Sequence, residues 1–227
     1  MIVAIDGTAG SGKSTTSKGV AEKLGFLYLD TGAMYRAATA AVLSASIDSD
    51  DESAVSDCVE TIEIDFDESG RLIFLNGMDV SQTIRGREVT QNVSAVSAYP
   101  QVRKRMVAMQ REIAGYRDFV VEGRDIGTVV FPNADFKFFI VASIEERAKR
   151  RQKDLAGLGI EQTVNDIVKN LKRRDALDSS REVSPLTKSE DAVEVDTTSM
   201  TIEQQIDLIV THVRDRSIKK ETQSTSE

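Results

Sequence analysis

Several residue types are scarce in this chain of 227 residues, and each shortage removes a class of protein or site. The single cysteine, Cys58, allows no intrachain disulfide and no cysteine-rich metal site, and we expect it to be a small core residue of a helix. Tryptophan is absent and aromatic residues make up only 5% of the chain, which argues against a surface that stacks nucleic-acid bases. The single histidine, His212, lies in a terminal helical pattern with no nucleophile nearby in the sequence, so we expect it to be solvated or to cap a helix.

The charge and hydropathy of the sequence argue against further classes of protein. The net charge of −8 disfavours duplex DNA or RNA as a partner, because such binding relies on lysine and arginine neutralising phosphates. No apolar run is long enough to cross a bilayer, and the first apolar run starts at Ile2, which leaves no room for a signal peptide. We therefore expect a cytoplasmic protein with no nucleic-acid or membrane partner. The 40% of hydrophobic residues is ordinary for a globular protein, and the length suits one domain over residues 1–227.

The clearest motif is a glycine-rich loop that follows the apolar run Ile2 to Ile5 directly. Its spacing, a glycine, four residues and then Gly-Lys-Ser, is that of a P-loop. Glycines let successive backbone N–H groups converge on phosphate oxygens, and the helix that follows directs the positive end of its dipole at the same phosphates. We expect Lys13 to contact the β- and γ-phosphates of ATP and the Ser14 hydroxyl to bind Mg²⁺. The residues predicted to bind ATP are Gly7, Thr8, Ala9, Gly10, Ser11, Gly12, Lys13, Ser14 and Thr15.

Apolar runs alternating with helical patterns predict an α/β fold, with a five-stranded parallel sheet and helices on both faces. The predicted strands are residues 2–6, 26–29, 119–122, 137–141 and 192–195. Between the second and third of these, residues 61–86 show strand-like alternation with turns at 67–70 and 76–77, which predicts a small inserted antiparallel lobe. The core would then be about residues 1–60 and 87–216, followed by a polar, frayed tail from 217 to 227.

Arginines recur at helical spacing in the second half of the chain, so that they share helix faces. One face carries Arg147, Arg150 and Arg151, and the face of the next helix carries Arg174, Asp178 and Arg181. A flexible, glycine-containing connection at 156–159 joins the two helices. The pattern indicates a helical lid over about residues 147–181 that closes over phosphates and excludes water. A solvated helical hairpin with internal ion pairs fits the spacing equally well.

Several runs of the sequence resemble the bacterial cytidylate kinases, whose fold is that of the P-loop kinases and whose members carry an inserted β lobe. The resemblance covers nearly the whole chain up to the tail, and its strongest runs are residues 6–15, 29–36 and 122–132, supported by 143–148 and 173–186. It implies phosphoryl transfer from ATP to CMP or dCMP, with Mg²⁺ as cofactor. We expect a monomer, because the fold needs no partner to complete its site.

The resemblance also implies roles for individual residues. Catalysis would rest on Lys13, Arg124, Arg147 and Arg151. Contacts to the acceptor would come from Asp30, Thr31 and Arg36 at the monophosphate, from Ser94, Arg103 and Asp125 at cytosine, from Asp178 and Arg181 near the ribose and phosphate, and from Arg124 at the transferred phosphate.

The chemistry of the three residues expected at the base suits cytosine. A guanidinium and a hydroxyl can donate to its O2 and N3 atoms, and a carboxylate can accept from its amine. Uracil would leave Asp125 facing an acceptor. For Glu122 at a strand end, orienting metal-bound water and capping the structure are equally open.

Other readings are available for a P-loop protein. The nearest alternative is a P-loop kinase for AMP, UMP or shikimate, and the features that argue against it are Ser94 with Arg103 and the run at 123–125. A GTP-dependent switch needs an Asn-Lys-x-Asp motif to read guanine, which this chain lacks, and its Asp-x-x-Gly matches at 67–70 and 154–157 do not follow strands. A nucleic-acid-binding ATPase conflicts with the acidic charge and the few aromatic residues.

Overall fold

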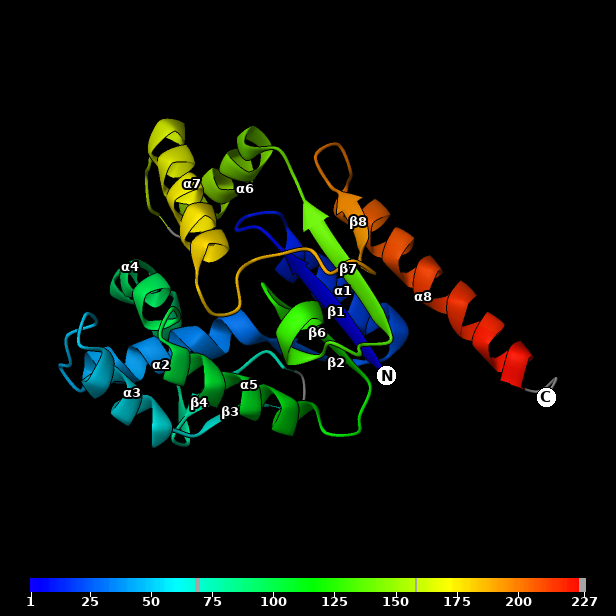
Figure 1. The fold of residues 1–227 in the computed structure, drawn as a ribbon. Helices are drawn as coiled ribbons and strands as arrows, with labels where there is room; N and C mark the ends of the chain where they lie inside the picture. Colours follow the sequence, from blue (N-terminus) through cyan, green and yellow to red (C-terminus); the bar gives the residue numbers. More distant parts are fainter. Residues whose placement is uncertain (68–69, 158, 225–227) are drawn as a thin grey trace.

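The computed structural model describes residues 1–67, 70–157 and 159–224, with side chains up to residue 217. A parallel sheet of five strands in the order β2-β6-β1-β7-β8 forms its centre (Figure 1). The strands are β1 Ile2–Gly7, β2 Leu27–Asp30, β6 Phe119–Gly123, β7 Phe136–Val141 and β8 Val193–Asp196. The predicted parallel sheet is confirmed, and each strand begins and ends within one residue of its predicted limits. Because β1 lies in the middle, the loop that follows it opens between the ends of β6 and β7.

Helices cover both faces of this sheet, as predicted. Successive residues of β1 point to opposite faces: Val3 and Ile5 pack with α1 and α8 in one apolar cluster, and Ala4 packs with α2 and α5 in another. The bounds of these four helices are α1 Lys13–Leu24, α2 Thr31–Ser44, α5 Pro100–Ala114 and α8 Ile202–Ser224. The sheet is therefore buried on both sides, and its open edge for ligands is the one at the carboxyl ends of the strands.

The antiparallel insert is also confirmed. It is a three-stranded sheet in the order β3-β4-β5, whose inner face packs on α2. Asn76 and Gly77 join the last two strands with positive φ angles of 50° and 77°, the backbone of a tight hairpin turn. The other predicted turn, at 67–70, includes residues 68 and 69, which lie outside the described residues. The elements here are α3 Glu52–Glu60, β3 Ile64–Phe66, β4 Ile73–Leu75, β5 Met78–Asp79, the short helix η1 Thr83–Arg85 and α4 Arg87–Val96.

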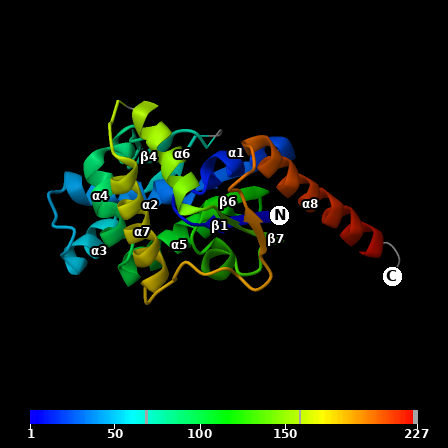
Figure 2. The ribbon, with the colours of Figure 1, turned by 90° about the horizontal axis from the view of Figure 1, so that it is seen from above.

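Two helices, α6 Ile144–Gly157 and α7 Val164–Ser180, pack against each other beyond the carboxyl end of β7 (Figures 1 and 2). They enclose a small apolar cluster of Leu155, Ile167 and Leu171, and this cluster includes Ala9 of the glycine-rich loop. The helical pair predicted as a lid thus rests directly on the phosphate-binding loop. The predicted flexible connection at 156–159 includes residue 158, which lies outside the described residues.

Three local expectations need correction. The C-terminal segment does not fray at residue 217, because α8 continues to Ser224 and extends away from the body (Figure 2); no glycine or proline interrupts it, and lysine and glutamate favour the helix. His212 is neither solvated nor a cap: its half-buried ring lies edge-on to Phe136 and Phe138, and burial lowers its pKa. Cys58 lies on α3 as expected but is only half-buried. Among the described helices, none is long and apolar enough to span a membrane.

Candidate active site

The glycine-rich loop leaves β1 and enters α1 in the conformation that its glycines permit. Gly7 has a φ of 151°, and a Cβ there would lie 2.1 Å from the carbonyl oxygen of Ile140 on β7. Gly12 stands before the first turn of α1 with a left-handed φ of 93°. The amino group of Lys13 is buried and donates to the carbonyl oxygen of Thr8 at 3.0 Å, while Ser14 is exposed at the start of the helix. The start of α1 is therefore open for phosphates, with a lysine held at the loop.

Charged groups from neighbouring strand ends surround Lys13. Burial and the nearby guanidinium of Arg124 lower the pKa of Lys13, against the opposing effects of Glu122 and Asp6. Burial, together with the charge of Asp30, raises the pKa of Glu122 at the end of β6. Tyr28 donates its hydroxyl proton to the Glu122 carboxylate, and Ser14 also bonds to it. Glu122 is thus tied into the base of the site, which fits both roles left open by the sequence.

The residues expected at the acceptor phosphate lie on α2, which starts at the end of β2. Asp30 caps this helix by accepting the amide of Ala33 at 2.9 Å. The Thr31 hydroxyl is buried and donates to the carbonyl oxygen of Glu122 at 2.7 Å, so its proton already has a partner. Arg36, further along α2, donates to the Thr90 hydroxyl at 3.0 Å.

Four arginines lie near enough for their charges to act on one another, and one of them, Arg124, also acts on Lys13 of the loop. Burial is the main cause that lowers the pKa of Arg36, and the charges of Arg151 and Arg124 add to it. Burial and the charges of Arg124 and Arg36 lower the pKa of Arg174 to about 10. The structure therefore brings together three predicted site residues and one, Arg174, that was not assigned to the site. Its position one helical turn before Asp178 was the signal that could have identified it.

The residues expected at the base include a buried ion pair. Arg103 on α5 donates to the carboxylate of Asp125, and both side chains are at most 5% exposed. The same guanidinium donates to the carbonyl oxygen of Ser97 at 3.2 Å and lies 5.3 Å from the ring centre of Tyr35. Ser94 is half-buried one turn before Ser97 on α4.

Helix α7 is joined to the segment after β6 by residues predicted for the site. Arg124 donates to Asp178 at 2.9 Å, and Arg181 lies 3.7 Å from the other oxygen of that carboxylate. Although burial opposes it, the charges of Arg124 and Arg181 lower the pKa of Asp178. Asp178 thus stays ionised between two cations.

The arginines of α6 divide into two groups. The charge of Arg151 lowers the pKa values of Arg36 and Arg174, so Arg151 lies near these two arginines. Arg147 instead donates to the carbonyl oxygen of Ala9 at 3.1 Å and to Asp175 at 2.6 Å. Arg150 donates to the carbonyl oxygen of Ser11 at 2.9 Å and to both oxygens of Thr197 after β8. Two lid arginines therefore hold the loop backbone, a contact that helical spacing alone does not reveal.

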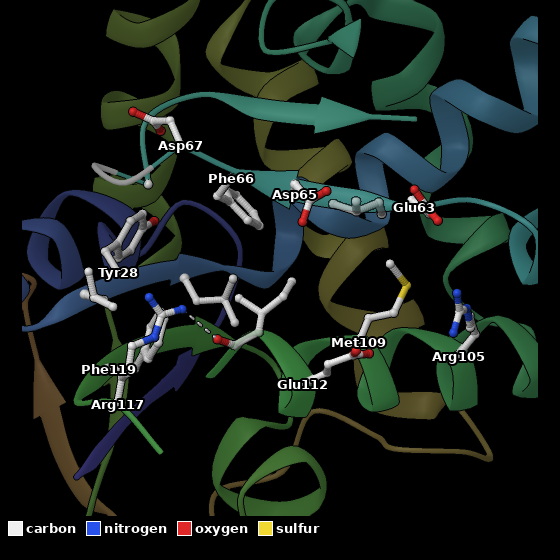
Figure 3. A pocket seen from close by; sticks show the side chains of 15 residues that line it. Tyr28, Glu63, Asp65, Phe66, Asp67, Arg105, Met109, Glu112, Arg117 and Phe119 are labelled. Atoms are coloured by element: carbon white, nitrogen blue, oxygen red, sulfur yellow. Dashed lines mark hydrogen bonds between the residues drawn. The ribbon is translucent and has the colours of Figure 1, made fainter. Parts of the chain in front are cut away.

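A cavity of about 550 Å³ lies elsewhere, between β3, the β2 edge and α5 (Figure 3). Glu63 and Asp65 of the insert face it from one side, and Arg105 and Glu112 of α5 lie across from them, with Arg117 of the segment that follows α5 (Figure 3). No residue predicted for the site lines this cavity. The residues of the sequence motifs lie instead around the P-loop and the neighbouring strand ends.

A parallel sheet whose central strand enters a P-loop, with a lysine and several guanidinium groups in front of it, defines a P-loop kinase fold. Comparison with known proteins specifies the family. The sequence pattern of the cytidylate kinase family matches residues 3–215. The chain belongs to the cytidylate kinase family, which confirms the resemblance seen in its sequence motifs.

Individual relatives match the sequence of this chain over nearly their full length. The cytidylate kinase of Geobacillus sp. (strain WCH70) is 48% identical over 216 residues, which are 94% of this chain and 96% of that protein. The cytidylate kinase of Halalkalibacterium halodurans is 45% identical over 218 residues, 95% of this chain and 98% of its own. That of Lactobacillus gasseri is 48% identical over 208 residues, 91% of this chain and 90% of its own.

Proposed function

We propose that this chain transfers the γ-phosphoryl group of ATP to CMP or dCMP, giving ADP and the corresponding diphosphate. The observation that carries the proposal is the gathering of four guanidinium groups in front of a P-loop lysine, in a member of the cytidylate kinase family. Like charges this close repel one another, so the site favours a ligand rich in negative charge. The phosphates of a donor and an acceptor nucleotide together supply that charge.

The donor would bind through residues 7–15, with backbone amides and Lys13 on its phosphates. Ser14 and Glu122 fit a Mg²⁺ ion. The exposed Ser14 hydroxyl and the Glu122 carboxylate are oxygen ligands of the kind that this cation prefers. When bound, Mg²⁺ would neutralise charge on the phosphates being exchanged. Arg147 would act through the loop backbone that it holds at Ala9.

The acceptor phosphate would lie against Arg36 and the start of α2, where Asp30 and Thr31 stand. Arg124 and Arg151 would stabilise the charge on the transferred group, and no covalent nucleophile is needed because the acceptor is already an anion. Ser94, Arg103 and Asp125 would read cytosine, and Asp178 with Arg181 would contact the sugar and phosphate. The buried Arg103–Asp125 pair supports this, because it holds a donor and an acceptor side by side.

We also propose which segments of the chain form the acceptor-binding lobe, the lid and the core. Residues 61–86 would form the acceptor-binding lobe, residues 147–181 the lid, and about 1–60 with 87–216 the core. All the proposed ligands come from one chain, which supports a monomer as the active form. Light scattering at assay concentration tests this, and a stable dimer would contradict it.

A coupled assay of ADP release tests the function directly, with ATP and Mg²⁺ against CMP, dCMP, UMP, AMP and shikimate. Turnover with CMP and dCMP and little with the others supports the proposal. Turnover with another acceptor would keep the P-loop kinase but remove Ser94, Arg103 and Asp125 from base recognition. Release of ADP that does not depend on any acceptor would indicate an ATPase or a nucleotide switch.

A further inference from the structure

A carboxylate outside the predicted site holds the segment that carries two of its residues. Asp6, the residue before Gly7 on β1, is only 5% exposed. Its Oδ1 atom accepts the backbone N–H of Ile126 and its Oδ2 atom accepts that of Gly127, each at 2.8 Å. These are the first two amides of the short π-helix η2, Ile126–Val130, which follows Arg124 and Asp125.

The first amides of a helix have no partner within it, and the residue just before the helix commonly accepts one of them with its own side chain. Asp125 stands in that position, and aspartate is among the residues best suited to the task. In the described structure its carboxylate makes no such bond and instead pairs with Arg103. Asp6 satisfies the amides from the neighbouring strand, which leaves Asp125 to face Arg103.

The packing around η2 allows the Asp6 carboxylate to come close to the backbone of this helix. A Cβ on Gly127 would lie 3.1 Å from the Lys137 side chain, a tight contact, and 3.5 Å from the Asp6 carboxylate, an ordinary van der Waals contact, so the glycine leaves the Asp6 carboxylate close to this backbone. The arrangement also costs free energy, because burial and the nearby Asp125 raise the pKa of Asp6 to about 6 against the two amide bonds. A neutral residue would avoid that cost but could not accept both amides.

We propose that Asp6 is a positioning residue for acceptor selection: by capping η2 from β1, it keeps the Asp125 carboxylate turned toward Arg103 and the acceptor base. The proposal rests on the proposed function. Asp6 directly precedes the P-loop, so one strand end sets both the donor loop and the base-reading segment. Without Asp6, Asp125 would turn back to cap its own helix and Arg103 would lose its partner.

The test compares Asp6→Ala and Asp6→Asn with wild type, using kcat/KM for CMP and for UMP at saturating ATP. Asparagine has nearly the same shape, but in place of one carboxylate oxygen it has an NH2 group, which would face one of the two amides donor to donor, so in the native geometry it caps only the other. We expect the CMP to UMP ratio to fall at least about tenfold in Asp6→Ala, equivalent to one lost buried hydrogen bond, and less in Asp6→Asn. The KM for ATP should stay near its wild-type value. The matched control is Asp135→Asn, because Asp135 accepts the amide of Ile2 at 2.8 Å at the far end of β1 and is exposed.

A double-mutant cycle separates positioning from a general loss of structure. If Asp6 acts through Asp125, Asp6→Ala should not lower the ratio further in an Asp125→Ala background. An equal further loss there, or an unchanged ratio in Asp6→Ala alone, would overturn the proposal. A crystal structure of Asp6→Ala, which removes both caps, supplies a readout that needs no substrate: Asp125 turned toward the η2 amides supports the proposal, and Asp125 still paired with Arg103 rejects it. This readout holds even if wild type fails to phosphorylate CMP, which would refute the proposed function alone.

Discussion

The Nε atom of Arg124 donates to the Oδ2 atom of Asp178 at 2.9 Å, and this bond joins the turn after β6 to the lid helix α7. Both residues were assigned to the acceptor site from the sequence, yet here each serves as the other's partner. Arg124 also belongs to the guanidinium group in front of the P-loop, so the bond couples the lid to the charge in the site. A bound phosphate would compete with Asp178 for the same guanidinium.

Asp178→Asn should lower the free energy of unfolding at pH 7 by about 1 to 3 kcal/mol, the range for a hydrogen bond to a charged group. Because the native pKa of Asp178 is lowered, its contribution is complete above the ordinary value of 3.8 and is lost as the pH falls through the native pKa. The difference from wild type should therefore be constant from pH 7 to 5 and shrink below about pH 4. Urea unfolding at each pH measures it.

Asp154→Asn is the matched control for this prediction, since Asp154 is an exposed carboxylate on the other lid helix, α6. It should change stability little at any pH. A difference between Asp178→Asn and wild type that grows as the pH is lowered would contradict the assigned ion pair.

Lys13→Ala should abolish turnover and leave the fold intact. The ammonium group is held at the loop by the Thr8 carbonyl, so its removal takes the positive charge from the phosphates without opening the apolar core. Steady-state kinetics and a thermal melt measure the two effects. Retention of more than about a tenth of the wild-type rate would remove Lys13 from catalysis. Lys23→Ala is the control: Lys23 lies on the same helix in an exposed pair with Asp207 and should leave the rate unchanged.

The sheet could be predicted because its strands are short and mostly apolar and alternate with helical patterns, and because β1 enters a loop whose glycine spacing has few alternatives. Some helix starts carry their capping chemistry in the local sequence: Thr201 and Gln204 bond reciprocally at the start of α8, as in a capping box. The π-helix η2 was missed because its capping group, Asp6, lies 120 residues away in the chain. A cap supplied from another strand leaves no local pattern.

The contacts of the predicted site residues were less accessible from the sequence than the residues themselves. Helical spacing placed Arg147 and Arg151 on one face, but their surroundings differ: Arg147 donates to the Ala9 carbonyl, whereas the charge of Arg151 acts on Arg36. Which arginine meets backbone and which meets phosphate depends on how the lid helices sit on the loop. That is a tertiary relationship that the spacing of residues along one helix does not encode.

Arg150→Ala should weaken ATP use more than CMP use. Arg150 donates to the Ser11 carbonyl and to Thr197, so its loss frees the loop backbone from the segment after β8. We expect kcat/KM for ATP to fall about tenfold or more, the effect of losing one charged hydrogen bond, with a smaller change in KM for CMP. Lys153→Ala, exposed on the same helix, should leave both constants unchanged. Equal losses for the two substrates would show that Arg150 does not act through the donor loop.

Removal of the Asp125 carboxylate should separate stability from specificity. Asp125→Ala should erode the preference for CMP over UMP and cost about 3 to 5 kcal/mol of stability, because Arg103 is left buried without its partner. Replacing both residues by leucine should recover most of the stability, since no unpaired charge remains, but not the preference for CMP. Acceptor kinetics and urea unfolding of wild type, Asp125→Ala and the double variant measure both quantities. If the double variant recovers the CMP preference together with its stability, the ion pair serves the fold alone and cytosine is read by other residues.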